Sequence, residues 1–191
     1  MSAAPVLVPL EKRLVFSHVI EGLYFRALKD QMTDRLRDRL RDEAGLDLSK
    51  KLEPALTFVK WTRCLEITAQ ELAPQKSMEE GLEYIGLILT RGYFETLVGK
   101  ALAGILKIIG PMRGLKRMDR SLRSGNNFGE VMVTEKGPGH VEFWCNELGT
   151  ARHHMLGLIK AGAEVCGAKN LRGEITHFDD RGVTFDLKWD P

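Results

Sequence analysis

The pattern of hydrophobic and polar positions changes character about two thirds of the way along the chain. Up to Asn127, apolar residues recur every three or four positions, a spacing typical of helices with one buried face. Beyond Asn127, apolar and polar residues alternate in short runs between turn residues, which is typical of strands. The expected helices cover residues 19–44, 54–73, 78–109 and 112–123. The expected later elements are a hairpin at 128–147, a helix at 150–168 and a hairpin at 171–189.

Individual residues predict where these elements begin and end. Gly45 and Gly110 are expected to end helices, because glycine takes a left-handed conformation without strain. Pro54 suits the first turn of the second helix. Ser77 and Thr150 offer hydroxyl groups that can cap the helices that follow them. In the last strand Val183, Phe185, Leu187 and Trp189 share one face.

Together these elements predict an α+β fold: a helical N-terminal region packed on a small antiparallel sheet in hairpin–helix–hairpin order. We expect a flexible lead over residues 1–12 and a single domain over 13–191. Within that domain, 13–124 is mainly helical and 125–191 forms the ββαββ part.

The segment 92–110, "GYFETLVGKALAGILKIIG", is apolar enough to raise the question of a membrane span. A span needs about 20 consecutive apolar residues, and Lys100 and Lys107 interrupt this one. We therefore expect a buried helix and no membrane span. Three cysteines without paired spacing favour a reducing, cytoplasmic environment, and the N-terminus lacks the pattern of a signal peptide.

Four glycines lie inside the third helical pattern, at 86, 92, 99 and 104, and the helix could break near Gly92. Each costs roughly 1 kcal/mol relative to alanine, so some interaction must offset them. One interpretation is close packing against another element. The other is a cavity, because glycines leave room for a ligand. Gly104→Leu separates them, since it would fill a pocket or overpack a contact.

The predicted fourth helix carries basic residues on one face, namely Arg113, Lys116, Arg117 and Arg120. This face could contact an anionic ligand or partner, or it could simply be solvated. Nucleic acid is disfavoured, because the net charge is only +2 and no aromatic residues alternate with the basic ones. The chain has no nucleotide-binding or catalytic signature, and the scattered histidines predict no metal site, so we do not expect an enzyme.

A resemblance to a known family is carried by "VIEGLYFRAL", "RGYFETLVGKAL", "GPMRGLKRM", "RSGNNFGE", "GPGHVEFWCNE" and "GVTFDLKW". These segments resemble a paralogous family of unknown function restricted to myxobacteria. Over residues 80–189 the order of elements is also similar to the superfamily of haem NO-binding, 4-vinyl reductase and Golgi-transport (TRAPP) subunit domains. That resemblance implies helices around an antiparallel sheet, a ligand pocket between them, and in some members a dimer.

The same resemblance speaks against haem. A haem-binding member would place an axial histidine on the helix before the first hairpin, here 91–123, and this stretch has none. The family's Tyr-x-Ser-x-Arg motif would fall at 143–147, where Phe143, Cys145 and Glu147 stand instead. We therefore expect no cofactor.

The leading hypothesis is a non-enzymatic sensor or ligand-binding domain that holds a small hydrophobic molecule, with or without a negative charge, between helices and sheet. Arg113 or Arg117 would contact an anionic head group. The candidate wall residues are Tyr93, Phe94, Leu97, Gly104, Ile108, Phe143 and Cys145. The alternative is a homodimeric scaffold or protein-interaction subunit with a filled core, whose basic helix meets an acidic partner.

Overall fold

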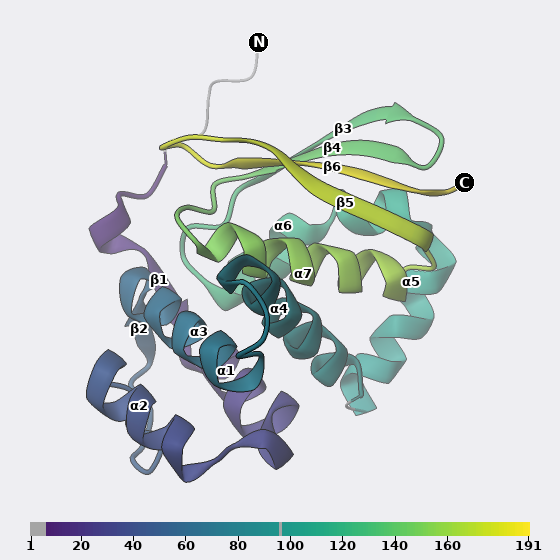
Figure 1. The fold of residues 1–191 in the computed structure, drawn as a ribbon. Helices are drawn as coiled ribbons and strands as arrows, with labels where there is room; N and C mark the ends of the chain where they lie inside the picture. The colour runs from purple at the N-terminus through teal and green to yellow at the C-terminus, as the bar shows by residue number, and fades with distance from the viewer. Residues whose placement is uncertain (1–6, 96) are drawn as a thin grey trace.

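The computed structural model describes residues 7–95 and 97–191, with side chains for all of these except 95 and 97–99. Figure 1 shows a sheet along one side of the molecule, with helix α7 (Ala151–Val165) against it and α4 (Met78–Glu95) against the other side of α7. The remaining N-terminal helices gather around α3 (Phe58–Leu72) at the end of the molecule away from the sheet. The predicted α+β class is confirmed.

The main sheet has four antiparallel strands in the order β3-β4-β6-β5. They are β3 (Val131–Gly137), β4 (His140–Cys145), β5 (Lys169–Phe178) and β6 (Val183–Asp190). The predicted alternation is present, because Val183, Phe185 and Leu187 are fully buried against α7. Phe143 lies opposite Phe185 in the register, so both hairpins contribute to one apolar layer.

The helix predicted over 19–44 is wrong as a single element. The chain forms α1 (Ser17–Glu21), a π-helical turn η2 (Gly22–Ala27), a 3-10 turn η3 (Lys29–Gln31) and α2 (Asp34–Ala44). Thr33 restarts the helix, because its hydroxyl accepts the amide proton of Leu36 at 3.1 Å. The predicted stop is present, since Gly45 takes a left-handed conformation with φ of 65°.

The prediction for Pro54 is also wrong. Residues after it form a short strand, β2 (Ala55–Thr57), which pairs with β1 (Leu14–Phe16). Helix α3 begins only at Phe58, because the hydroxyl of Thr57 accepts the amide proton of Lys60 and caps it. The predicted lead over 1–12 lies partly outside the described residues, and its last three residues form the 3-10 turn η1 (Leu10–Lys12).

The third predicted helix begins as expected. The hydroxyl of Ser77 accepts the amide proton of Glu80 at 3.2 Å, and the carboxylate of Glu80 accepts the amide proton of Ser77 at 3.1 Å. The region then divides into α4 and α5 (Leu97–Leu115), with residue 96 outside the described residues. Helix α6 (Met118–Gly125) follows, so the fourth predicted helix is split between the end of α5 and α6.

Two further expectations need correction. Thr150 does not cap α7: its backbone is already helical, and its hydroxyl donates to the carboxylate of Glu66 at 2.7 Å. The segment 92–110 is not a buried helix throughout, because no described residue from 100 to 113 is fully buried. Ile108 is 86% exposed. Helix α5 packs only one side against α4 and α7.

Two glycines bring α4 and α7 into backbone contact. A Cβ atom on Gly86 would lie 2.1 Å from the carbonyl oxygen of His154, and one on Gly157 would lie 2.0 Å from that of Glu83. Since both contacts are with backbone, only glycine fits at either position. For Gly86 the close-packing interpretation is therefore correct. Gly92 also packs closely, with Ala27 as its neighbour.

Candidate functional site

A cleft of about 300 Å³ lies where α5 bends beside the hairpin of β3 and β4. The bend is at Gly110, whose φ of 76° and ψ of 168° interrupt the helix. Positive φ strongly favours glycine, and the proline at 111 then starts a new helical turn with its φ already fixed. The predicted helix stop at Gly110 is thus a turn in the wall of a cleft.

The hairpin side of the cleft is held in place by backbone contacts. Gly139 has φ of 66°, and its carbonyl oxygen accepts the amide proton of Trp189 at 2.8 Å. A Cβ atom on Gly139 would lie 2.2 Å from the carbonyl oxygen of Trp189. The turn of the first hairpin is therefore fastened to the end of β6, and this fixes the indole of Trp189 beside the cleft.

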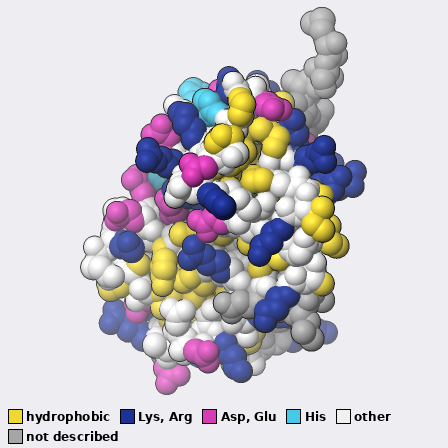
Figure 2. All heavy atoms as spheres, turned by 90° about the vertical axis from the view of Figure 1, so that its right-hand side faces the viewer, with side chains coloured by type: hydrophobic (Ala, Val, Ile, Leu, Met, Phe, Trp, Pro, Cys, Tyr) yellow, Lys and Arg dark blue, Asp and Glu magenta, His cyan; other side chains and the backbone are white. Residues whose placement is uncertain are grey.

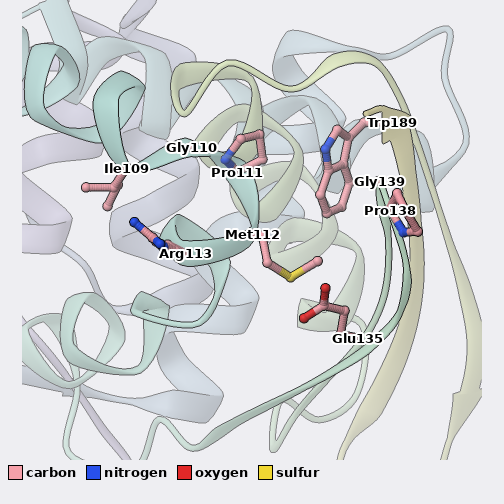
Figure 3. A pocket seen from close by; sticks show the side chains of 9 residues that line it. All are labelled: Ile109, Gly110, Pro111, Met112, Arg113, Glu135, Pro138, Gly139 and Trp189. Carbon is pink, nitrogen blue, oxygen red and sulfur yellow. The ribbon is translucent and has the colours of Figure 1, made fainter.

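The cleft has largely apolar walls and, among the described residues, one cation without a carboxylate partner. Figure 3 shows Arg113 on the helix side and Glu135 and Trp189 on the strand side, with Met112 between them. Glu135 is neutralised by Lys116 at 3.1 Å, whereas Arg113 has no carboxylate partner among the described residues. The lining residues are Ile109, Gly110, Pro111, Met112, Arg113, Glu135, Pro138, Gly139 and Trp189.

Of the predicted site residues whose side chains the structure describes, only Arg113 lines this cleft. Arg117 is exposed beyond it, just before α6. Ile108 and Gly104 are exposed on α5, and a Cβ atom on Gly104 would meet nothing within 4 Å. The side chain of Leu97 lies outside the described residues.

The other predicted wall residues lie elsewhere. Tyr93 and Phe94 contact each other edge to face near the end of α4, with ring centroids 5.2 Å apart. Phe143 and Cys145 are buried in the layer between sheet and α7. The structure therefore does not bring the predicted wall together around one cavity. Sequence reasoning missed Met112 and Trp189; the Gly110-Pro111 bend and the last residue of an alternating strand were the available signals.

The segment 143–147 joins the sheet to the N-terminal helices. The guanidinium of buried Arg13 donates to the carbonyl oxygen of Asn146 at 2.7 Å and lies 5.0 Å from the ring centre of Phe128. Asn146 in turn binds the backbone of Glu130 and Phe128. Burial raises the pKa of Glu147 to about 7, although the nearby charge of Arg13 opposes the shift. This junction is filled by protein groups and has a structural role.

A second hollow of about 260 Å³ lies at the turn between α3 and α4. It is lined mainly by small and polar residues of that turn, from Ala69 to Met78. Within the described part of the chain, no cluster of three His, Cys, Asp or Glu side chains could hold a metal ion. Over the same residues, no helix is both long and apolar enough to cross a membrane.

Comparison with solved structures defines the class of fold. An oxygen-binding H-NOX domain related to soluble guanylate cyclases superposes with a TM-score of 0.63 at 13% identity, covering 90% of this chain and 94% of that one. A mutant H-NOX protein from K. algicida with unliganded Fe(II) gives 0.63 at 15% identity, covering 92% and 97%. A mutant H-NOX of T. Tengcongensis gives 0.63 at 12% identity, with the same coverage. At these identities the likeness establishes an H-NOX-like fold.

The chain itself belongs to the family described as Protein of unknown function (DUF2378), whose model matches residues 13–190. The predicted membership of a family of unknown function is thereby confirmed, and its restriction to myxobacteria stays a prediction. No curated protein matches the sequence.

The H-NOX-like fold raises the question of haem, and the residues present do not fit it. Neither hollow described above is lined by a histidine. The one fully buried histidine among the described residues, His154, has a free Nε2 but lies edge to face against Trp61. The backbone of Gly86 packs directly against the carbonyl oxygen of His154, since a Cβ atom on Gly86 would lie only 2.1 Å from it. Burial lowers the pKa of His154 to about 4, so it is a neutral core residue.

Proposed function

We propose that this protein is a ligand-binding sensor domain whose cleft at Gly110 holds a small apolar molecule with a negatively charged group. The observation that carries the proposal is Arg113, which has no carboxylate partner among the described residues and lines the same cleft as Met112, Pro111 and Trp189. An unpaired guanidinium can form paired hydrogen bonds with a carboxylate, sulfonate or phosphate. The surrounding apolar groups favour a flat hydrocarbon body.

The size of the cleft limits the ligand. Small-molecule sites usually range from about 300 to 1,000 Å³, so this one suits a small ligand with one or two ring systems. The carboxylate of Glu135 opposes an anionic ligand only weakly, because Lys116 neutralises it. The proposal is one of binding without chemistry, because among the described residues that line the cleft Glu135 is the only acid and none is a histidine or cysteine.

The position of the cleft suggests how binding would be sensed. Its two sides are the bend of α5 and the hairpin fastened to β6. A ligand in contact with both sides would favour one angle between the two halves of α5. Because Gly110 sits at the bend, that angle can change without strain in a side chain.

Fluorescence titration with anilinonaphthalene sulfonate tests the proposal, because this dye combines two apolar ring systems with one anionic group. We expect Trp189→Ala and Arg113→Gln each to weaken dye binding at least fivefold. Arg120→Gln is the matched control, since Arg120 is also an exposed arginine but does not line the cleft. Equal dye affinity in all four proteins would refute the proposal.

The second candidate function, a protein-interaction subunit, is supported by the filled interior. Backbone contacts at Gly86 and Gly157 bring α4 and α7 so close that no side chain or ligand fits between them at these positions. In this interpretation the protein acts through its surface, as a homodimer or with another protein. Native mass spectrometry of the purified protein tells directly whether it is a homodimer or a monomer that would need another protein as its partner.

A further inference from the structure

One face of α5 is apolar and exposed, although its sequence is that of a packing surface. Ala101, Gly104, Ile105 and Ile108 are spaced by three and four residues and therefore share a face. Ile105 is 58% exposed and Ile108 is 86% exposed. Half-buried Leu102 and Leu106 occupy the opposite side, which packs on the domain. We call the exposed set the α5 stripe.

Nothing in the described part of the molecule requires a glycine at position 104. It lies in the middle of a helix, its φ is not positive, and a Cβ atom there would meet nothing within 4 Å. A glycine at such a position costs roughly 1 kcal/mol relative to alanine. With Ala101 it places two small residues beside two exposed isoleucines. Small residues next to large ones let the side-chain ridge of a second helix approach closely.

Lys100 and Lys107 lie seven residues apart, along one edge of the α5 stripe. Within the described part of the chain, neither has a carboxylate partner. Figure 2 faces this side of the molecule and shows hydrophobic side chains among Lys and Arg side chains. A matching partner would therefore carry acidic residues beside its own apolar stripe.

We propose that the α5 stripe docks an amphipathic helix of a partner protein, with acidic residues of that helix facing Lys100 and Lys107. Two other occupants fit less well. In a two-fold contact between copies, the same patch meets itself, so the lysines of both copies would crowd one interface. A membrane surface would gain from large apolar side chains at 101 and 104, where the chain has alanine and glycine.

Fluorescence anisotropy with a designed peptide tests this docking surface on the full chain. The probe is a fluorescein-labelled helix with leucines at every third and fourth position, flanked by glutamates. A twin with lysines in place of the glutamates is the charge control. We expect the acidic peptide to bind at least tenfold more tightly than its twin. Lys100→Glu combined with Lys107→Glu should reverse that preference.

Variants of the α5 stripe provide the second arm. Ile108→Ser, and separately Gly104→Leu, should each weaken acidic-peptide binding at least tenfold without loss of folding, because both positions are exposed. Val59→Ser is the matched control, since Val59 is an apolar residue of α3 that is 60% exposed. Trp189→Ala should leave peptide binding unchanged, so failure of the cleft proposal and failure of this one can be told apart.

Three outcomes would overturn the inference. The first is equal binding of both peptides, or binding that the α5 variants do not change. The second is self-association in sedimentation experiments that Ile108→Ser abolishes, which identifies a second copy as the occupant. The third is binding to vesicles with anionic lipids that depends on Ile108, without binding of the acidic peptide.

Discussion

Gly86→Ala tests the close approach of α4 and α7, on which the filled interior depends. The new Cβ atom would lie 2.1 Å from the carbonyl oxygen of His154 and 2.9 Å from the amide nitrogen of Leu158. Because both are backbone atoms, no side chain can move aside and the helices must separate. Overpacking costs about 1–3 kcal/mol, and a contact this short lies at the upper end. Alanine recovers roughly 1 kcal/mol of helix propensity, so we expect a net loss of about 2 kcal/mol.

Gly104→Ala is the matched control, since it makes the same change in a helix with nothing within 4 Å. It should stabilise the protein by roughly 0.5–1 kcal/mol. For a domain of this size 1 kcal/mol corresponds to about 2–4 °C in Tm. Calorimetry or thermal circular dichroism should therefore place the Tm of Gly86→Ala about 5–10 °C below that of Gly104→Ala. Equal Tm values would refute the reasoning about the α4–α7 contact.

The remaining predictions concern a buried acid, a helix cap and a hairpin turn. Burial raises the pKa of Glu147 from 4.5 to about 7, so between these values the folded state holds a proton that the unfolded state has lost. The free energy of unfolding of the wild type should therefore fall by roughly 3 kcal/mol as pH rises from about 5 to about 8. Urea unfolding of Glu147→Gln should not show this fall, and the same pH dependence in both proteins would contradict the assignment. Ser77→Ala should cost about 1 kcal/mol in the same assay, because it removes the cap of α4, and a change near zero would contradict that role. Gly139→Ala should destabilise the protein by about 2 kcal/mol or more and shift the amide resonance of Trp189, because Gly139 has positive φ and its Cβ would lie 2.2 Å from a backbone oxygen. Gly162→Ala is the control and should show neither effect, because the space at its Cβ is open.

Strong periodic patterns in the sequence predicted the fold well. The alternation at Val183, Phe185 and Leu187 predicted the buried face of β6, and the capping hydroxyl of Ser77 predicted the start of α4. Weak or short signals failed. Strands β1 and β2 have three residues each, too few for alternation to be visible, so the paired segment after Pro54 was predicted as helix.

The glycines show why packing is harder to predict than secondary structure. Gly86 and Gly104 look alike in sequence, since each interrupts an apolar helical pattern. One is forced by a backbone on α7, and the other faces solvent. The difference depends on Gly157, a partner far along the chain that no local pattern connects with Gly86.

The candidate site was predictable in one residue only. Arg113 was expected as an anion contact, and it lines the cleft. Met112 and Trp189 come together only because the helix bends at Gly110 and the hairpin turn is fastened to β6. Neither the bend nor the fastened turn can be predicted from hydrophobic periodicity, because periodicity indicates which face of an element is buried and not the shape of its end.

The central claim, that the cleft at the α5 bend binds a small apolar anion, is tested most directly by mapping where such a molecule sits. The measurement is an amide HSQC titration of nitrogen-labelled protein with anilinonaphthalene sulfonate. We predict that the largest saturable shifts fall on Gly110, Met112, Gly139 and the indole of Trp189, and that in Arg113→Gln they need at least fivefold more dye to saturate. Shifts confined to Ile105 and Ile108 on the α5 stripe, or spread without saturation, would contradict the claim.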